Sequence, residues 1–333
     1  MNVLVTGVGG GVGQGILKAL SLSELDIKVF AADVTPLSSG LLRNKNSFLI
    51  PKLETMEGDP SEMLARLREN EIVCWLVGSE YEIDFAQLNR DSLIEAGIFT
   101  PRVSIELMKV ANDKLQTAHW MQSHGFRTPL TIEFSAPWEA EEVSSQVGFP
   151  CIVKPRKGTS AKGVIVCSNC DELRAAFSSS SDQICQAFID GKEYTCSVFM
   201  TRTGNILGPF CASRTLRGGS SWEIEVVKNP TLENILVAIG VRLSFEGSLN
   251  IQLIERDGDY YVIELNSRFS GTTAVRAHFG FNEPDFYLRS YLLDEELTQP
   301  NIRLGRCSRY IEEVFIESGV SETLGAGVIN RWY

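Results

Sequence analysis

Apolar and polar residues follow one another along the first part of the chain in a pattern that predicts strands and helices in turn. Three short apolar runs are typical of buried strands, at residues 2–6, 27–32 and 72–77. Helical periodicity follows the first run at residues 12–20 and precedes the third at residues 61–69. Because strands that alternate with helices favour a parallel sheet covered on both faces, residues 1–98 are predicted to form an α/β domain.

The pattern changes beyond residue 98, where strands lengthen and mix with helices. Helices are predicted at residues 104–110, 113–123, 172–178 and 231–243, and strands at residues 151–154, 164–167, 183–188, 193–201, 205–212, 248–255 and 259–265. The last two strands flank an Asp257-Gly258 pair, which predicts a β-hairpin. This mixture indicates an α+β region, and the weakly periodic residues 317–333 are expected to form a tail or a docking arm.

The composition is that of an ordinary globular protein of 333 residues, with 44% hydrophobic and 22% charged residues. A chain of this length favours two or three packed units. The formal net charge of −11 argues against a general nucleic-acid binder, which needs a basic surface. Apolar runs are too short for a membrane span, and residues 2–6 form a strand without a basic leader, so a cytoplasmic protein is expected.

Eight cysteines are scattered along the chain, and several lie in apolar stretches where a thiol behaves as a small hydrophobic group. Cys167 and Cys170 form a lone C-x-x-C pair without a second pair or a nearby histidine, a pattern that does not favour a zinc site. Free thiols of this kind fit a reducing compartment.

A glycine-rich turn, T-G-V-G-G-G-V-G at residues 6–13, follows the first strand and opens the first helix, and Asp33 ends the second strand. Such a turn can bind the pyrophosphate of a dinucleotide at a helix N-terminus. Its spacing also resembles that of short-chain dehydrogenases, although no tyrosine of this chain is followed by a lysine four positions later. Three explanations stay open: a packing turn, a site for a substrate or effector anion, and an NAD(P) site.

Lysine and glycine residues downstream predict a phosphate-binding site. Lys154 ends the apolar strand of G-F-P-C-I-V-K-P, where its charge can neutralise phosphate oxygens. The loop at residues 156–163 lacks the spacing of a Walker A motif, but its N–H groups can turn toward phosphate and it can close over a nucleotide. The candidate phosphate-binding residues of this loop are Gly158, Thr159, Ser160 and Gly163.

Oxygen-bearing side chains gather on the two strands of the predicted hairpin. Gln252 of N-I-Q and Glu264 of V-I-E-L-N-S-R lie on paired strands, and Asn266 is two positions after Glu264, so it faces the same side. The neighbouring positions are apolar, which argues against a simple solvent face. Amide and carboxylate oxygens suit Mg²⁺ together with phosphate oxygens, so these three residues are predicted metal ligands.

These motifs are accompanied by N-D-K at residues 112–114 and I-C-Q-A-F-I-D-G-K-E-Y-T at residues 184–195, and their order resembles the ATP-grasp superfamily. The resemblance covers about residues 100–316 and is particularly to the carbamoyl phosphate synthetase large subunit and its single-unit carboxylate–amine ligase relatives. It implies a Rossmann-like pre-ATP-grasp domain at residues 1–98, an ATP-grasp domain at residues 99–316 with subdomains at about 112–185 and 186–316, and a C-terminal tail at residues 317–333.

The resemblance also implies contacts with the nucleotide. Lys114 would reach the phosphates together with Lys154, and Glu193 would accept hydrogen bonds from the ribose hydroxyl groups. Backbone groups of the hinge would read the adenine edge, at Gln186, Ala187 and Phe188. Relatives often carry an acidic residue in place of Gln186, so this contact is expected to differ here.

Arginines are implied in the transfer step. Arg268 is expected to face the transferred γ-phosphoryl group, where charge spreads over the oxygens in the transition state. Arg214 or Arg217, predicted in a glycine-containing loop at residues 212–222, would bind the carboxylate or the acyl phosphate. The acceptor pocket is expected to involve residues 270–273 and Arg276, and Ser267, which replaces the proline of many relatives, leaves the substrate undetermined.

The predicted activity is that of a ligase that uses ATP and Mg²⁺ (or Mn²⁺), activates a small-molecule carboxylate as an acyl phosphate and joins it to an amine. No nucleic-acid or membrane partner is expected. Members of the family are often dimers, so a homodimer is compatible with the sequence. The alternatives are an NAD(P)-dependent oxidoreductase that uses the glycine-rich turn, and a protein that binds ATP and a ligand without turnover.

Overall fold

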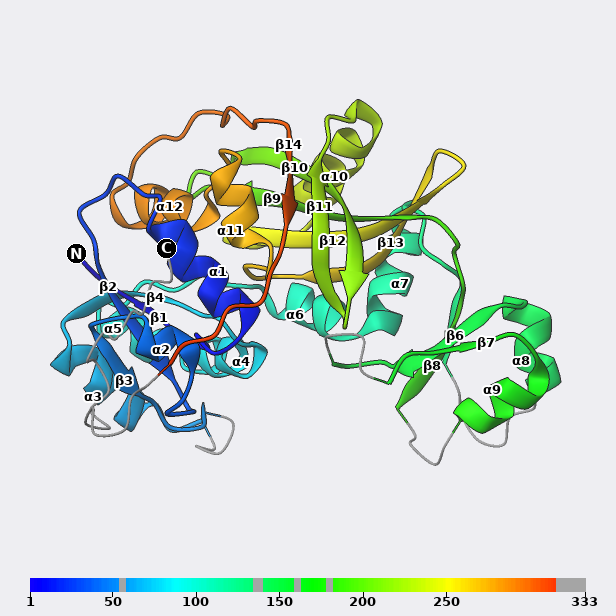
Figure 1. Cartoon of the computed structure of the whole chain (residues 1–333), viewed down its shortest axis with the longest axis horizontal. Helices are drawn as coiled ribbons and strands as arrows, with labels where there is room; N and C mark the ends of the chain where they lie inside the picture. Colours follow the sequence, from blue (N-terminus) through cyan, green and yellow to red (C-terminus); the bar gives the residue numbers. More distant parts are fainter. Residues whose placement is uncertain (54–57, 134–139, 159–162, 178–181, 316–333) are drawn as a thin grey trace.

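Three β-sheets organise the chain in the computed structural model (Figure 1), which describes residues 1–53, 58–133, 140–158, 163–177 and 182–315. One four-stranded sheet is parallel, whereas a second four-stranded sheet and a six-stranded sheet are antiparallel. Among the helices of these described residues, none is long and apolar enough to cross a membrane.

The N-terminal domain contains the parallel sheet. Its elements are β1 (Asn2–Val5), α1 (Gly11–Leu20), β2 (Lys28–Asp33), α2 (Ser39–Leu42), β3 (Ser47–Leu49), α3 (Ser61–Glu69), β4 (Ile72–Leu76), α4 (Glu80–Leu88) and α5 (Arg90–Glu95). The strand order is β3-β2-β1-β4. Val3 and Leu4 are both fully buried although they point to opposite faces, as expected for a parallel strand covered on both sides. The predicted α/β fold of this region is confirmed.

Close backbone contacts explain the glycines in the turn between β1 and α1. A Cβ atom at Gly13 would lie 2.4 Å from the carbonyl oxygen of Gly7, and Gly7 itself has a φ of +61°. The carboxylate of Asp33 accepts hydrogen bonds from the backbone N–H groups of Gly9 at 2.7 Å and Thr35 at 3.0 Å, so it fastens the turn from within. These contacts favour the packing explanation for the glycine-rich turn.

Two helices and the small antiparallel sheet follow. The elements are α6 (Ile105–Asn112), α7 (Lys114–Ser123), β5 (Thr131–Glu133), α8 (Ala140–Val147), β6 (Cys151–Pro155), β7 (Ile165–Cys167), α9 (Cys170–Ala176) and β8 (Gln183–Ala187). The strand order is β5-β8-β6-β7, and α8 and α9 cover the sheet through a core that includes Val143 and Leu173. Figure 1 shows this unit at one end of the molecule, away from the N-terminal sheet.

The six-stranded sheet forms the centre of the molecule. Its elements and the helices that follow are β9 (Lys192–Met200), β10 (Ile206–Arg217), β11 (Ser220–Val226), α10 (Pro230–Arg242), β12 (Gly247–Arg256), β13 (Asp259–Asn266), α11 (Thr273–His278), α12 (Glu283–Tyr287), η2 (Leu288–Leu292) and β14 (Gly305–Ser308). The strand order is β13-β12-β9-β10-β11-β14. One face packs on α6, α7 and α10, and part of the other face packs on α11, α12 and the N-terminal domain.

The predicted hairpin between β12 and β13 is confirmed. The two strands pair along their length, and the turn between them contains Asp257 and Gly258 with φ values of 55° and 83°. Positive φ at both central positions is the requirement of a type I′ turn, which explains why this dipeptide predicts a hairpin.

Arg214 and Arg217 were expected in a loop, and this expectation is wrong: both lie on β10. Strand β11 pairs with this polar segment from Arg214 to Arg217 and holds it extended, whereas the pairing of β10 with β9 ends at Ser213. The turn is confined to Gly218 and Gly219, whose φ values are 57° and 75°. Strands β11 and β14 were also missed, because their formation depends on neighbours in the sheet rather than on their own pattern.

The N-terminal domain docks on the C-terminal helices. Helix α1 lies against α11 and α12, and the Ser23 hydroxyl after α1 donates to the Asp285 carboxylate of α12 at 2.5 Å. Figure 1 shows the chain crossing from η2 to β14 and then returning toward the N-terminal domain. There Glu312 forms an ion pair with Arg43 at 2.7 Å.

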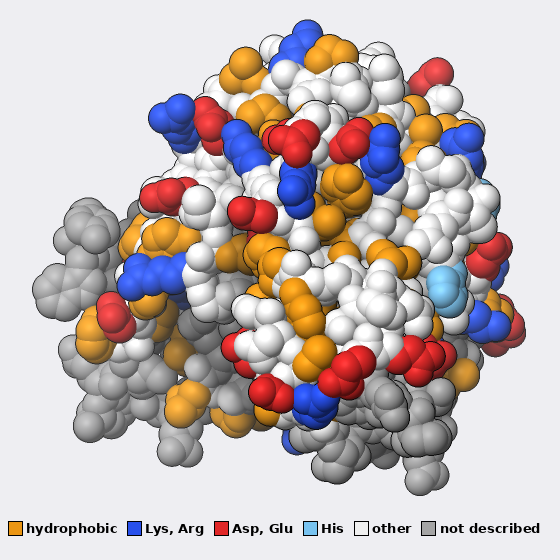
Figure 2. Space-filling model, turned by 90° about the vertical axis from the view of Figure 1, so that its right-hand side faces the viewer, with side chains coloured by type: hydrophobic (Ala, Val, Ile, Leu, Met, Phe, Trp, Pro, Cys, Tyr) orange, Lys and Arg blue, Asp and Glu red, His pale blue; other side chains and the backbone are white. Residues whose placement is uncertain are grey.

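Charged side chains of both signs are interspersed on the face shown in Figure 2, which is the end of the molecule at the right of Figure 1. On that face, basic groups alternate with acidic and apolar ones, and the formal net charge of the chain is −11. Such a face differs from the basic tract with which proteins bind nucleic acids.

An ion pair between Arg276 of α11 and Glu283 of α12 is fully buried against the six-stranded sheet. Nη1 of Arg276 donates to the Glu283 carboxylate at 3.0 Å, and Ser197 of β9 donates to the same oxygen at 2.5 Å. Ser248 of β12 also donates to this carboxylate, and Nη2 of Arg276 donates to the side-chain oxygen of Asn250. Arg276, which the sequence suggested for the acceptor pocket, thus belongs to a buried hydrogen-bond network that connects α11 and α12 to β9 and β12.

Replacing Glu283 should destabilise the fold. Glu283→Gln leaves the Arg276 charge unpaired inside the core, so we expect the free energy of unfolding to fall by about 3–5 kcal/mol. Urea denaturation followed by tryptophan fluorescence measures this change. Glu296→Gln, at an exposed carboxylate, is the control and should change the same free energy by less than about 0.5 kcal/mol. Equal effects of both substitutions would contradict a structural role for the buried pair.

Candidate active site

Two paired strands form the floor of the site. In the β12–β13 pair, Gln252 stands opposite Glu264, and Asn250 stands opposite Asn266. Directly opposite side chains of antiparallel strands have Cβ atoms about 5 Å apart, and side chains two positions apart share a face. The register therefore brings the three predicted metal ligands onto one face of the sheet. Their binding of a metal ion stays a prediction.

Arg214 of β10 reaches across this face toward two other candidate residues. Its Nη2 donates to Oε1 of Gln252 at 2.7 Å, and its Nε donates to Oε2 of Glu193 at 3.2 Å. The Arg217 guanidinium instead lies 4.8 Å from the ring centre of Trp222, at the exposed end of β10. Of the two arginines, the structure places Arg214 in the site, between the predicted ribose acceptor and a predicted metal ligand.

Lys154 of β6 belongs to the wall opposite this floor. Its ammonium group is buried and donates to Oε1 of Gln186 at 2.7 Å. Burial, and then the positive charge of Lys114, lower the pKa of Lys154 to about 8, whereas the negative charge of Glu264 raises it. Charged groups from α7, β6 and β13 are therefore close enough to influence one another. Because Gln186 is neutral, it satisfies a hydrogen bond but leaves the Lys154 charge available for an anion.

Lys114, in the first turn of α7, contacts the loop that follows β6. Its backbone N–H donates to the carbonyl oxygen of Arg156 at 3.0 Å, and its ammonium group donates to that of Gly158 at 2.7 Å. Gly158 and Gly163 have φ values of +109° and +72°, which residues with a side chain rarely adopt. The start of the candidate phosphate loop is thus held beside the two lysines. Outside the described residues lie two further members of the predicted loop, Thr159 and Ser160.

The predicted adenine hinge connects β8 to β9. The backbone N–H of Ala187 donates to the carbonyl oxygen of Leu130 at 2.9 Å, and that of Phe188 donates to the carbonyl oxygen of Pro150 at 3.2 Å. These two donors are thus used within the small sheet. Contact of the hinge with adenine stays a prediction, as does contact of Glu193 with the ribose.

Arg268 lies at the border between the six-stranded sheet and the N-terminal domain. Its Nη2 donates to Oε1 of Glu80 at 2.6 Å, and its Nη1 donates to the carbonyl oxygen of Phe269 at 3.1 Å. Glu80 begins α4 and precedes Arg268 by 188 positions in the chain. The predicted contact of Arg268 with a phosphoryl group stays a prediction, because in this structure the guanidinium is paired with a carboxylate.

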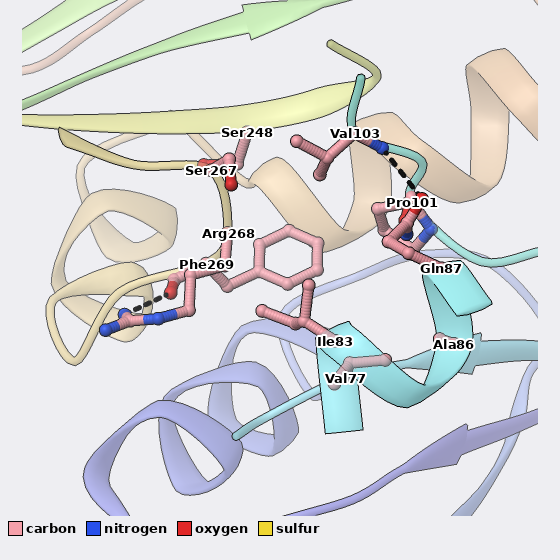
Figure 3. A pocket seen from close by; sticks show the side chains of 10 residues that line it. All are labelled: Val77, Ile83, Ala86, Gln87, Pro101, Val103, Ser248, Ser267, Arg268 and Phe269. Atoms are coloured by element: carbon pink, nitrogen blue, oxygen red, sulfur yellow. Dashed lines mark hydrogen bonds between the residues drawn. The ribbon is translucent and has the colours of Figure 1, made fainter. Parts of the chain in front are cut away.

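Two adjoining cavities at this border were not predicted from the sequence. The smaller one has polar side chains in its walls: Glu80, Asp84, Asn112, Asn266 and Arg268. The larger one, which has room for about one water molecule, is drawn in Figure 3, where Ile83 and the ring of Phe269 point into it. The cavities share Ile83, Ser267 and Arg268 as lining residues. The sequence around Glu80 indicates that a helix begins there, but it does not indicate that Glu80 contacts Arg268.

The oxygen-bearing side chains of the floor are of the kinds that bind a divalent cation such as Mg²⁺ when phosphate oxygens supply the remaining ligands. Within the described part of the chain, no three His, Cys, Asp or Glu side chains gather into a cation site. The floor offers instead one carboxylate, Glu264, beside the amide oxygens of Gln252 and Asn266. Mg²⁺ commonly binds through one or two carboxylates together with substrate phosphates and water. A cation at this floor would therefore depend on a bound nucleotide.

Comparison with known proteins agrees with this geometry. A family model described as an ATP-grasp domain matches residues 111–272. The D-alanine–D-alanine ligase of Cupriavidus taiwanensis is 34% identical over 93 residues, which are 27% of this chain and 28% of that ligase. The carbamoyl phosphate synthase large chain of Pyrococcus furiosus is 26% identical over 190 residues, which are 51% of this chain and 18% of that protein. The chain thus matches between about a sixth and a third of the length of these two relatives.

A solved structure shows the same fold. It is the biotin carboxylase domain dimer of the Hydrogenobacter thermophilus 2-oxoglutarate carboxylase, in complex with MgADP, ADP and bicarbonate. The TM-score is 0.70 at 18% identity, and the match covers 92% of this chain and 73% of that chain. The resemblance to ATP-grasp proteins, including a carbamoyl phosphate synthase large chain, is confirmed. The matched residues 111–272 include both lysines and all three predicted metal ligands of the site, so this part of the chain is similar to an ATP-grasp domain.

Proposed function

We propose that the chain is an ATP-dependent ligase that joins a carboxylate to an amine, forming an amide or peptide-like bond, and releases ADP and phosphate. One observation carries the proposal: Lys114, Lys154 and Glu264 converge from two antiparallel sheets and a helix between them. Two cations close to one carboxylate suit the triphosphate of a nucleotide together with its divalent cation. The similarity to a D-alanine–D-alanine ligase supports the same class of reaction.

The proposed reaction has two balanced steps. A carboxylate oxygen attacks the γ-phosphorus of ATP, and the bond to the bridging oxygen breaks as ADP leaves. The lone pair of the amine then attacks the carbon of the acyl phosphate, phosphate leaves, and the amine loses a proton to solvent. Phosphoryl transfer of this kind depends on positioning and on stabilised charge, so no covalent nucleophile of the protein is required.

The residues of the site divide between the nucleotide and the substrate. Lys114 and Lys154 would bind the phosphates, and Mg²⁺ or Mn²⁺ would rest on Glu264 with the two amide oxygens. When bound, this cation would neutralise charge on the phosphate oxygens. Arg214 would hold Gln252 in place, because it already donates to that side chain. Arg268, which donates to Glu80 at the border of the N-terminal domain, would face the γ-phosphoryl group as it passes to the substrate carboxylate.

The oxidoreductase alternative gains no support from the N-terminal turn. In a dinucleotide site an acidic residue after the second strand binds the ribose, whereas Asp33 accepts hydrogen bonds from Gly9 and Thr35 within the turn. A thermal-shift titration compares the two ligands directly: we expect stabilisation by Mg·ATP, and a shift with NADPH or NADH alone would overturn the ligase proposal.

A cytoplasmic homodimer is a further part of the proposal. Its dimeric state is supported by the dimer of the biotin carboxylase domain.

Removal of the proposed metal carboxylate should abolish turnover. With Mg·ATP, a grid of carboxylates and hydroxylamine as a general amine, we expect ADP release and a hydroxamate product from the native chain. Glu264→Ala should lower the rate of ADP release by at least about 100-fold. Loss of a side chain that only orients a metal ligand already lowers metal affinity or activity by about 10–100-fold. Glu62→Ala, at an exposed acid of α3, is the control and should keep the native rate. Unchanged turnover in Glu264→Ala would contradict the metal assignment, and binding without any turnover would favour a carrier.

Nucleotide affinity should weaken above about pH 8. The pKa of Lys154 is lowered to about 8, so its ammonium is charged below that pH and neutral above it in the free protein. Binding of phosphate then requires uptake of a proton, and the dissociation constant of ADP should rise toward about tenfold per pH unit. Isothermal titration between pH 7.5 and 9.5 measures this slope. Lys154→Arg, which stays charged throughout, should flatten it, and an equal slope in that variant would count against Lys154 as the titrating group.

A further inference from the structure

Arg309 follows β14 on the face of the six-stranded sheet that carries the proposed floor. Its backbone N–H donates to the carbonyl oxygen of Trp222 at 3.0 Å and so continues the pairing of β14 with β11. In this sheet Arg214, Ile224 and Cys307 stand opposite one another on neighbouring strands. Because side chains two positions apart share a face, Arg309 points to the same side as Arg214. The Arg309 guanidinium thus belongs to the side on which the nucleotide and its cation are proposed to lie.

The Arg309 guanidinium is partly buried without an acidic partner. Its Nη2 donates to the carbonyl oxygen of Gly271, and within the described residues it forms no ion pair with a carboxylate. Burial lowers the pKa of Arg309, and the Cys307 thiol raises it. In Arg156, by contrast, the hydrogen bond to Asp113 raises the pKa. A desolvated charge is stable in a protein when an opposite charge faces it, so the missing counter-charge indicates an anionic ligand.

The space beside this guanidinium is open. A Cβ atom at Gly271 would meet no atom of a non-adjacent described residue within 4 Å. A guanidinium carries five N–H donors in a planar fork, and in the described part of the chain the bond to Gly271 uses one of them. The remaining donors match two oxygens of a carboxylate or of a phosphate group.

Arg309 and Arg268 are close enough to hold the two ends of one small molecule. Gly271, which accepts from Arg309, follows Arg268 by three positions, a stretch of chain that spans at most about 11 Å. Arg268 is proposed to face the γ-phosphoryl group as it passes to the substrate carboxylate. A substrate whose reacting carboxylate lies there can therefore reach Arg309 with a second group on a short carbon chain.

We infer that the carboxylate substrate carries a second anionic group, a carboxylate or a phosphate, and that Arg309 binds this group through its remaining N–H donors. The inference rests on the proposed ligase function and narrows its substrate. Arg309 selects the substrate at the end remote from ATP, whereas Arg268 acts at the reacting end. A substrate with a single carboxylate would leave the Arg309 charge without a partner.

Matched pairs of compounds test the inference with the full chain, Mg·ATP and hydroxylamine. Malonate, succinate and glutarate are each compared with their half-amide, which has the same shape but a neutral second group. 3-Phosphonopropanoate is compared with butanoate, in which a methyl group replaces the phosphonate. We expect kcat/KM for ADP release with the preferred dianion to exceed that with its partner by at least about tenfold, because charge-assisted hydrogen bonds are lost. Succinate against 3-phosphonopropanoate distinguishes a second carboxylate from a phosphate.

Three variants connect this preference to Arg309. Arg309→Gln should lower the preference by at least about tenfold through a higher KM for the dianion, and it should keep the native dissociation constant of ADP in isothermal titration. Arg309→Lys keeps the charge but loses the planar fork, so it should retain part of the preference. Arg306→Gln is the control, because this side chain is 80% exposed and pairs with Glu225, and it should keep the whole preference.

The outcomes separate this inference from the ligase proposal. If only monocarboxylates release ADP, or if the neutral partners do so as well as the dianions, the inference is wrong and the ligase proposal stands. The inference is also wrong if Arg309→Gln binds ADP normally and keeps the preference for the dianion. Should Arg309→Gln lose affinity for ADP as well, the inference holds only if Arg309→Lys binds ADP normally and retains part of the preference. If no carboxylate of the wider grid releases ADP although Mg·ATP binds, the ligase proposal fails and the inference fails with it.

Discussion

The register between β12 and β13 is the constraint on which the candidate active site depends. It sets Gln252 opposite Glu264 and leaves Asn266 on the same face. Because side chains alternate along a strand, a slip by one residue would turn this set toward the core that packs on α6, α7 and α10. The tight turn at Asp257 and Gly258 sets the register of the hairpin as far as Leu253 and Val262. A one-residue irregularity between Gln252 and Leu253 then brings Gln252 opposite Glu264. The alignment of the predicted metal ligands thus depends on the turn and on this irregularity together.

The buried ion pair of Arg276 and Glu283 contacts β12, the inner of the two strands that form this floor. Asn250 is the register partner of Asn266, and its side-chain oxygen accepts a hydrogen bond from Arg276. A buried pair costs desolvation energy, and its members must be satisfied by neighbours, as Ser197 and Ser248 satisfy the Glu283 carboxylate here. Helices α11 and α12 carry the pair and also contact α1. Docking of the N-terminal domain and alignment of the floor therefore depend on the same two helices.

Features that depend on local pattern could be predicted from the sequence, and features that depend on distant partners could not. The parallel sheet, the hairpin and the strand that ends at Lys154 follow from runs of apolar residues and a turn dipeptide. Arg214 was misplaced because its polar segment becomes a strand through pairing with β11, a partner that the pattern of the segment itself does not indicate. The pairing of Glu80 with Arg268 joins residues 188 positions apart, and no spacing in either segment indicates it. Likewise Gln186 stands out as a departure from relatives, but its bond to Lys154 appears only when β6 and β8 pair.

The residues of the proposed site come from different parts of the chain. The lysines and oxygen ligands that would face the triphosphate lie on the two antiparallel sheets and α7, whereas Glu80, the partner of Arg268, begins α4 of the N-terminal domain. The segment from Asn266 to Arg268 connects the two, because Asn266 shares the face of Glu264 and the Arg268 guanidinium donates to Glu80. A shift of the N-terminal domain would therefore move Arg268 relative to the floor, whereas Lys114 and Lys154 do not depend on this contact.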